Sequence, residues 1–221
     1  MFKKLFSFII PITIFNQKSA ISQTLEVTWT DGKLVLDSNN TNYSYGSLQR
    51  ILRIGLKTIG FKKIASMQNI LVLGVAGGSV IKTLVDEINF KGKIKGVEID
   101  KEVITIANDY FHLDEIQNLE IIIDDAFEFV LETKEKYDLI IIDVFQDMKM
   151  PDFLFDKQFV DRICILLNSN GFILFNTMLL TIKDNERNKK YITDFGALNF
   201  KIKAIPRIEQ HNELIVIEKL E

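Results

Sequence analysis

Residues 70–79 read ILVLGVAGGS, an apolar strand followed at once by a glycine-rich turn. Small residues let a backbone turn tightly and approach a ligand, and the helix after such a turn offers free N–H groups. A dinucleotide-binding turn would need glycine at positions 74, 76 and 79, but Ala76 and Ser79 stand at two of them. The spacing therefore favours a nucleotide-type ligand without a pyrophosphate, and a turn with no ligand is the alternative. The candidate binding residues here are Gly74, Ala76, Gly77 and Gly78.

From this turn onward, apolar runs alternate with helical patterns. The strand-like runs are 70–73, 94–99, 119–123, 139–142 and 172–175, and the helical patterns are 79–89, 101–111, 126–135, 155–167 and about 186–195. Strands that are apolar throughout indicate a parallel sheet covered on both faces. The last two runs, 200–208 and 214–219, are joined by a short turn and must be antiparallel.

The first 45 residues have a different pattern, typical of β-structure. Apolar and polar residues alternate over 24–30, which is typical of a strand. Asp31-Gly32 is a sequence typical of a hairpin turn, and residues 33–36 are expected to form the second strand of that hairpin. A helix with one apolar face fits 47–59 and stops at Gly60. We therefore expect a β-rich segment over residues 1–45 and a nucleotide-binding domain over 46–221.

An apolar stretch over residues 5–15 follows Lys3 and Lys4, which resembles a signal peptide. Pro11 interrupts it, no cleavage-site pattern follows, and it is shorter than the ~20 residues that a membrane span needs. We expect a strand or short helix packed on the domain, with a cleaved signal as the alternative.

Composition narrows the class of protein. The chain has 221 residues and a net charge of −3, without a basic stripe, so neither nucleic acid nor a membrane is an expected partner. One cysteine, Cys164, excludes an internal disulfide framework, and two histidines leave no multi-histidine metal site. We expect a cytoplasmic protein with no metal.

Acidic residues end the next strands of the predicted sheet. Glu98 comes twenty residues after Gly78, where a carboxylate can accept hydrogen bonds from ribose hydroxyls. Asp100 is expected to cap the helix that begins at Lys101. Asp125 can accept from an adenine amine while the Ala126 N–H faces the ring, although Asp125 can also cap the helix that follows it.

Asp143 follows the strand 139–142 and is the candidate catalytic residue. Ligands of open α/β sheets bind in the crevice at the carboxyl ends of the strands. A carboxylate there can orient a nucleophile, accept its proton or hold a cationic ligand. The apolar loop 144–155 after it suggests a lid or a wall of the substrate site, or a loop packed on the surface.

Several stretches together resemble the spermidine synthase family and its class I methyltransferase relatives. They are ILVLGVAGGS, GVEIDKEV, DDAFEFV, KYDLIIIDVF and, more loosely, SNGFILFN, within residues 24–180. The resemblance implies a doubly wound, mostly parallel seven-stranded sheet with a small β-rich N-terminal appendage. It also implies a pocket for S-adenosylmethionine or its decarboxylated form.

Two departures from this family bear on the reaction. Members that transfer aminopropyl groups usually have an aspartate where this chain has Gly77, and a second one where it has Gln146. A buried amine cation without carboxylate partners is costly, so these losses weaken the case for a diamine acceptor. Asp147 is a candidate substitute, one residue further along.

The expectation is therefore an S-adenosylmethionine-dependent transferase, with methyl transfer to a small acceptor favoured over aminopropyl transfer. An amine is among the candidate acceptors, and a homodimer is a candidate assembly. The alternatives are a polyamine aminopropyltransferase and a non-catalytic nucleoside-binding relative. An NAD-dependent oxidoreductase is disfavoured by the failed glycine fingerprint.

Overall fold

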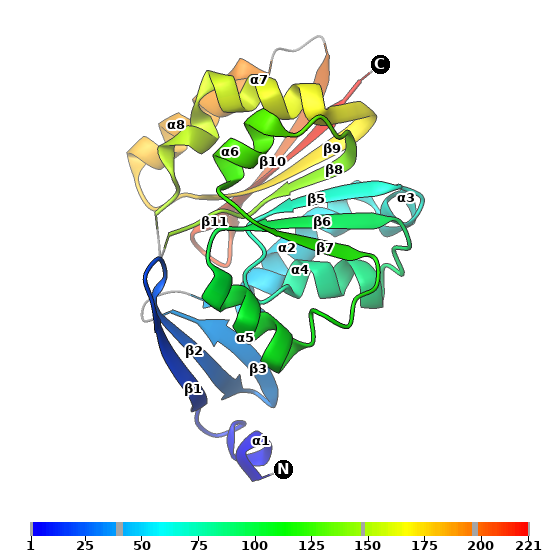
Figure 1. Ribbon diagram of the computed structural model, residues 1–221. Helices are drawn as coiled ribbons and strands as arrows, with labels where there is room; N and C mark the ends of the chain where they lie inside the picture. The colour runs from blue at the N-terminus through cyan, green and yellow to red at the C-terminus, as the bar shows by residue number, and fades with distance from the viewer. Residues whose placement is uncertain (1, 39–41, 147–148, 196–198, 221) are drawn as a thin grey trace.

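The computed structural model describes residues 2–38, 42–146, 149–195 and 199–220, and a seven-stranded sheet forms its centre (Figure 1). The strands are β5 (Asn69–Leu73), β6 (Lys93–Glu98), β7 (Leu119–Ile123), β8 (Tyr137–Ile142), β9 (Leu167–Met178), β10 (Phe200–Ile208) and β11 (Asn212–Lys219). Their order is β10-β11-β9-β8-β5-β6-β7, and β11 alone runs opposite to the other six strands. The predicted mostly parallel sheet with a terminal antiparallel hairpin is confirmed.

Helices cover both faces of this sheet (Figure 1). On one side lie α2 (Gly46–Ile59), α3 (Phe61–Ala65), α4 (Ser79–Lys82), the π-helix η1 (Thr83–Glu87) and α5 (Lys101–Phe111), and on the other α6 (Ala126–Glu132), α7 (Lys157–Leu166) and α8 (Ile182–Asp194). Side chains alternate along a strand, so Ile70 and Val72 pack into one core while Leu71 and Leu73 pack into the other. Burial on both faces explains the continuous apolar runs in the sequence.

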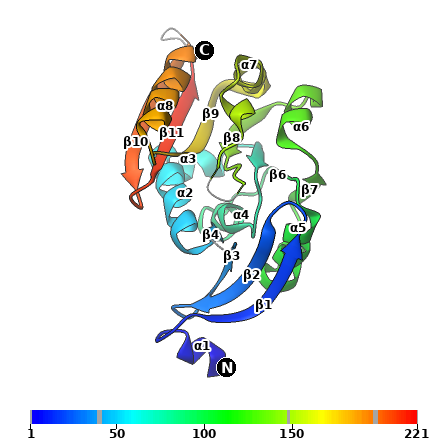
Figure 2. The ribbon, with the colours of Figure 1, turned by 90° about the vertical axis from the view of Figure 1, so that its left-hand side faces the viewer.

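A second, antiparallel sheet lies on α5 (Figure 2). Its strands are β1 (Ile12–Ser19), β2 (Gln23–Thr30), β3 (Lys33–Asp37) and β4 (Asn42–Ser44), in that order. Thr30 pairs with Lys33 around Asp31-Gly32, both with positive φ, which confirms the predicted hairpin. Leu25, Val27 and Leu36 pack against the outer face of α5.

Helix ends follow their capping residues. The helix predicted over 101–111 is confirmed: Asp100 accepts from Glu102 N at its start, and His112 ends it at φ 54°. The helix predicted near 186–195 begins earlier, at Ile182, because Thr181 and Asp184 form a capping box. The predicted helix 155–167 starts at Lys157 and follows a 3-10 turn, η2 (Asp152–Phe155).

Two local predictions need correction. The α-helix predicted over 79–89 stops at Lys82, where the Thr83 hydroxyl donates to Ser79 O and the chain continues as a π-helix. The stretch 5–15 was expected to form a strand or short helix packed on the domain. From Ile12 it does form strand β1, whose Ile14 and Phe15 pack on the N-terminal core, but α1 (Phe2–Phe6) buries none of its side chains. It is held instead through Ser7, which accepts from Asp31 N and Gly32 N. Within the described ranges, no helix has the length and apolar composition to span a bilayer.

The turn after β5 lies directly against the end of β8. Asp143 N donates to Leu73 O at 2.9 Å, and a Cβ added at Gly74 would lie 2.2 Å from Asp143 O. Gly74 also has φ 83°, which disfavours any other residue. Backbone contact and backbone conformation therefore both require glycine here.

We expect Gly74→Ala to lower the free energy of unfolding by about 4 kcal/mol or more, since the strand ends must separate. Gly60→Ala is the matched control, because Gly60 has φ 108° but no atom within 4 Å of an added Cβ. Its loss should be about 1–3 kcal/mol, from backbone strain alone. Urea unfolding would measure both, and equal losses would contradict the steric argument.

Candidate active site

A cavity of about 350 Å³ lies at the carboxyl edge of the central sheet. It brings together six of the predicted site residues, which are Gly74, Ala76, Glu98, Asp125, Ala126 and Asp143. These residues come from the ends of β5, β6, β7 and β8, which meet at one edge because the strands are parallel. The structure thus places them in one crevice, as expected from the strand pattern.

The other two predicted residues, Gly77 and Gly78, do not line the cavity. A Cβ at Gly77 would lie 2.8 Å from Ser44 Cβ, and Ser44 Oγ accepts from Ser79 N. A Cβ at Gly78 would lie 2.4 Å from a methyl group of Leu113, and its φ is 77°. These glycines let β4 and Leu113 close on the back of the turn.

Glu98 supports the turn from the end of β6. Its Oε2 accepts from Val75 N at 3.1 Å and Ala76 N at 3.0 Å, and its Oε1 accepts from Asp100 N at 3.1 Å. Burial raises the pKa of this carboxyl, and the three backbone donors only partly oppose the effect. Glu98 therefore joins two strand ends and also presents a carboxyl group to the cavity.

Asp125 caps α6 while lining the cavity with its neighbours Asp124 and Ala126. Its Oδ1 accepts from Phe127 N at 2.7 Å. The capping interaction that the sequence allowed is therefore present, and the cavity position that ligand binding requires is present as well.

Asp143 stands where β8 ends. Its Oδ1 accepts from Asn176 Nδ2 at 2.9 Å. Burial is the main cause that raises its pKa to about 7; Asn176 opposes this and the nearby Glu98 charge adds to it. A carboxyl group with such a pKa can accept a proton near neutral pH.

The loop after Asp143 forms one wall of the cavity. Val144, Phe145, Pro151 and Phe153 line it, so the expected apolar wall is present. Gln146 also lines it and pairs with Lys149 in an isolated bridge. The candidate substitute Asp147 lies outside the described residues.

Sequence reasoning missed the residues that complete the cavity. They are Ile21, Ser22 and Tyr43 from the N-terminal sheet, Ser47, Leu48 and Ile51 from α2, and Asn176, Met178 and Asn212 from β9 and β11. Asn176 ends the stretch SNGFILFN and Tyr43 begins the sequence Tyr43-Ser44-Tyr45-Gly46, which is also similar to the spermidine synthase family, but neither was weighed as a site residue. Only the fold brings these nine residues together.

Asp100 has a second role that the sequence did not suggest. Beside capping α5, its buried carboxyl accepts from Ser19 Oγ at 2.5 Å and Ser22 Oγ at 2.6 Å. Burial raises its pKa, but the hydroxyl and backbone donors outweigh that effect and the net pKa is lowered. The turn between β1 and β2 is thereby held at the cavity, with Ile21 and Ser22 in its wall.

The charged residues that line the cavity are all acidic. Glu98, Asp124, Asp125 and Asp143 are acidic, and among the lining residues that the structure describes there is no lysine, arginine or histidine. Nor do the described ranges hold a group of three or more histidine, cysteine, aspartate or glutamate side chains arranged to bind a metal ion. This lining fits an organic cation.

Comparison with known proteins identifies the family of this chain. Residues 49–208 match the family model "Spermine/spermidine synthase domain". A polyamine aminopropyltransferase of Vibrio vulnificus is 31% identical over 139 residues, which cover 61% of this chain and 46% of that protein. The aligned part thus spans about half the length of that curated relative.

Solved structures share the fold. A probable spermidine synthase from Corynebacterium glutamicum superposes with a TM-score of 0.75 at 17% identity, covering 94% of this chain and 79% of that one. A spermidine synthase in complex with the transition-state analogue AdoDATO has a TM-score of 0.68 at 17% identity, and the superposition covers 94% of this chain and 72% of that one. At such identities the likeness establishes the fold alone.

The preference for methyl transfer in the sequence analysis is wrong. The curated relatives with which the chain aligns are named polyamine aminopropyltransferases, not methyltransferases. The preference rested on two missing carboxylates, and Gly77, one of the two positions, faces Ser44 and does not line the cavity.

The raised pKa of Asp143 has a consequence for stability. The unfolded carboxyl ionises near pH 4, whereas the folded one ionises near 7, so the folded state loses stability as pH rises from about 4 to 7. We expect Asp143→Asn to remove this loss and raise Tm at pH 8 by several degrees, since each pKa unit is about 1.4 kcal/mol. At pH 4 the difference should nearly vanish.

Asp138→Asn, at the other end of β8, is the matched control. Asp138 accepts from Gln68 N, Asn69 N and Asn168 Nδ2, which outweigh burial and lower its pKa. Its replacement should destabilise the protein at pH 8 and have less effect at low pH. Calorimetric Tm values across this pH range would test both signs, and a shift of Asp143→Asn that is independent of pH would contradict the assignment.

Proposed function

Because the chain belongs to the spermine/spermidine synthase domain family, we propose that it transfers an aminopropyl group from decarboxylated S-adenosylmethionine to an amine acceptor. The observation that carries this proposal is the acidic cavity lining without a described basic residue. Decarboxylated S-adenosylmethionine has a sulfonium and an ammonium group and no carboxylate. Its charges complement the lining, whereas the carboxylate of S-adenosylmethionine would meet only like charges.

In this proposal, the nucleoside lies over the ends of β5, β6 and β7. Gly74 and Ala76 allow the close approach, and Glu98 accepts hydrogen bonds from the ribose hydroxyls. Asp125 and the Ala126 N–H contact the adenine. Gly77 and Gly78 contribute by shaping the turn from behind, where the structure has them against Ser44 and Leu113.

The acceptor then lies beyond Asp143, between the ends of β8, β9 and β11 and the start of α2. The apolar side chains of Leu48, Ile51 and Met178 line this part of the cavity, together with the amides of Asn176 and Asn212. Such a lining suits an alkyl amine, since its methylene groups gain apolar contact while its nitrogen meets Asp143.

The reaction needs orientation and one base. The amine nitrogen attacks the propyl carbon next to sulfur, the C–N bond forms as the C–S bond breaks, and the bonding electron pair neutralises the sulfonium. The products are methylthioadenosine and an aminopropylated ammonium ion. Asp143, with a pKa of about 7, accepts the proton that the acceptor nitrogen must lose.

We also propose that residues 1–45 act as a substrate-covering segment on the 46–221 domain. Ile21, Ser22 and Tyr43 supply part of the cavity lining, and Asp100 holds the turn that carries the first two. The cavity would therefore be enclosed jointly by the two segments.

Calorimetry can test the choice of donor. We expect decarboxylated S-adenosylmethionine to bind at least tenfold more tightly than S-adenosylmethionine, because only the latter brings a carboxylate to the acidic lining. The difference should shrink when Asp124 is changed to Asn. Tighter binding of S-adenosylmethionine would count against the proposed donor.

Turnover is the direct test of the proposed function. Purified protein, decarboxylated S-adenosylmethionine and a panel of mono-, di- and triamines should yield methylthioadenosine and one aminopropylated amine in equal amounts by mass spectrometry. Asp143→Asn should lower kcat by about 10²–10⁴, the usual contribution of a general base. Asp138→Asn, on the same strand, should retain activity once folding is verified.

The outcomes separate the alternatives. Donor binding without methylthioadenosine on any amine would support a non-catalytic relative and overturn the proposal. Formation of S-adenosylhomocysteine from S-adenosylmethionine would overturn it too.

A further inference from the structure

Two amide side chains, one buried and one half-buried, lead to the Asp143 carboxyl group. Asn176 is fully buried, and its Nδ2 donates to Asp143 Oδ1 at 2.9 Å. Asn212 in turn donates from its Nδ2 to Asn176 Oδ1 at 3.0 Å. The three side chains thus form one directed chain of hydrogen bonds from β11 through β9 to the end of β8.

We propose that Asn176 and Asn212 are positioning residues for the reaction: Asn176 orients the Asp143 carboxylate, and Asn212 fixes which end of the Asn176 amide faces it. The proposal rests on the proposed role of Asp143 as proton acceptor. It deepens that role by naming the groups that keep one carboxyl oxygen occupied and leave the other for the acceptor amine.

The orientation of the Asn176 amide matters because its N–H end and its carbonyl end have opposite effects on the ionisation of Asp143. Its N–H group stabilises a carboxylate, whereas its carbonyl can pair only with a protonated carboxyl. Asn176 alone could present either end to Asp143. The donor from Asn212 occupies the carbonyl, so the N–H end is directed to Asp143.

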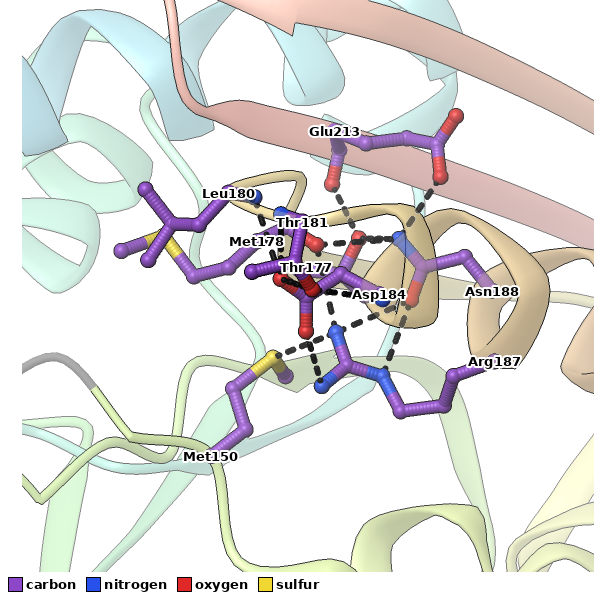
Figure 3. A network of polar contacts seen from close by, with 9 residues as sticks. All are labelled: Met150, Thr177, Met178, Leu180, Thr181, Asp184, Arg187, Asn188 and Glu213. Carbon is purple, nitrogen blue, oxygen red and sulfur yellow. Dashed lines mark hydrogen bonds and ion pairs between the residues drawn. The ribbon is translucent and has the colours of Figure 1, made fainter.

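A cluster of polar side chains around Asn188 holds together the two strands that carry these amides (Figure 3). Asn188 of α8 donates to Thr177 Oγ1 at 2.9 Å and to Glu213 Oε2 at 2.8 Å, and Thr177 Oγ1 donates to Glu213 O at 2.9 Å. Thr177 and Glu213 are also paired across β9 and β11.

Side chains alternate along each strand, so this cluster lies behind the neighbouring Asn176 and Asn212. Figure 3 also shows Arg187 reaching from α8 to Met178 O and to Met150 of the loop after Asp143. The amides therefore project from strand ends whose relative position is held by α8.

The same strand pair offers an internal comparison. At the opposite end of β8, Asp138 accepts from Asn168 Nδ2 of β9 at 2.8 Å, but it has two backbone donors besides. Within the described ranges, Asn176 is the only group that donates to the Asp143 carboxyl group. Loss of a single amide should therefore affect Asp143 far more than Asp138.

The experiment combines the pH dependence of kcat with a carboxyl ¹³C NMR titration of aspartate-labelled protein, in which Asp143→Asn identifies the signal. The variants are Asn176→Leu, Asn212→Leu and the double variant, with Asn168→Leu as the matched control. All four are compared with the wild type by circular dichroism, and the NMR titration is restricted to variants that retain the fold.

We expect Asn176→Leu to raise the pKa of Asp143 by about one unit and to lower kcat at pH 7 about fivefold, because a smaller fraction of the carboxyl group is then ionised. Asn212→Leu should give a smaller upward shift, since the Asn176 amide can then present either end. The double variant should resemble Asn176→Leu, because Asn212 acts through Asn176. Asn168→Leu should leave the Asp143 titration unchanged.

The proposal would be overturned if the pKa shifts of Asp143 in the two single variants added up in the double variant, or if Asn212→Leu left the pKa of Asp143 unchanged. So would a rise in acceptor KM with an unchanged pH profile, which would mean that the amides contact the acceptor directly. The NMR titration requires no turnover, so it decides the positioning role even if no amine is a substrate. Failure of the proposed function and failure of this inference are therefore distinguishable.

Discussion

The contact of main chain with main chain between Gly74 and Asp143 is the constraint from which the site follows. Parallel pairing of β5 with β8 brings Leu73 O to Asp143 N, and the turn after β5 can then pass only where no Cβ is present. The glycine turn and the carboxylate consequently share one crevice. The end of β6 joins them through Glu98, which accepts from the N–H groups of the same turn.

Local chemistry made much of this predictable. Asp31-Gly32 specified a hairpin, Asp100 specified a helix start, and strand-end carboxylates had to meet at one sheet edge because parallel strands share their direction. Contacts between distant residues carried no such signal. Ser19 meets Asp100 across 81 positions, and Asn176 and Asn212 read as ordinary strand and turn residues. Their roles follow from strand order and register, which single-residue patterns do not encode.

The choice of reaction shows a different limit of the sequence. Position 77 was weighed as if its side chain would face the ligand, but the structure directs it toward Ser44. The acidity of the cavity comes from strand-end residues that the pattern assigned mainly to nucleoside contacts and capping. Counting charges at motif positions thus underestimated the attraction for a cation, which depends on all the side chains around the cavity.

Because Asp100 holds the β1–β2 turn at the cavity, ligand binding in the cavity is coupled to the docking of the N-terminal hairpin. Ile21 and Ser22 complete the cavity only while Ser19 and Ser22 remain bonded to Asp100. A molecule that contacts this wall binds the docked form of the hairpin and not the undocked form, so its binding free energy adds to the free energy of docking. Local opening of the N-terminal sheet, and with it the exchange of its amide hydrogens, is therefore thermodynamically linked to occupancy of the cavity at the edge of the central sheet.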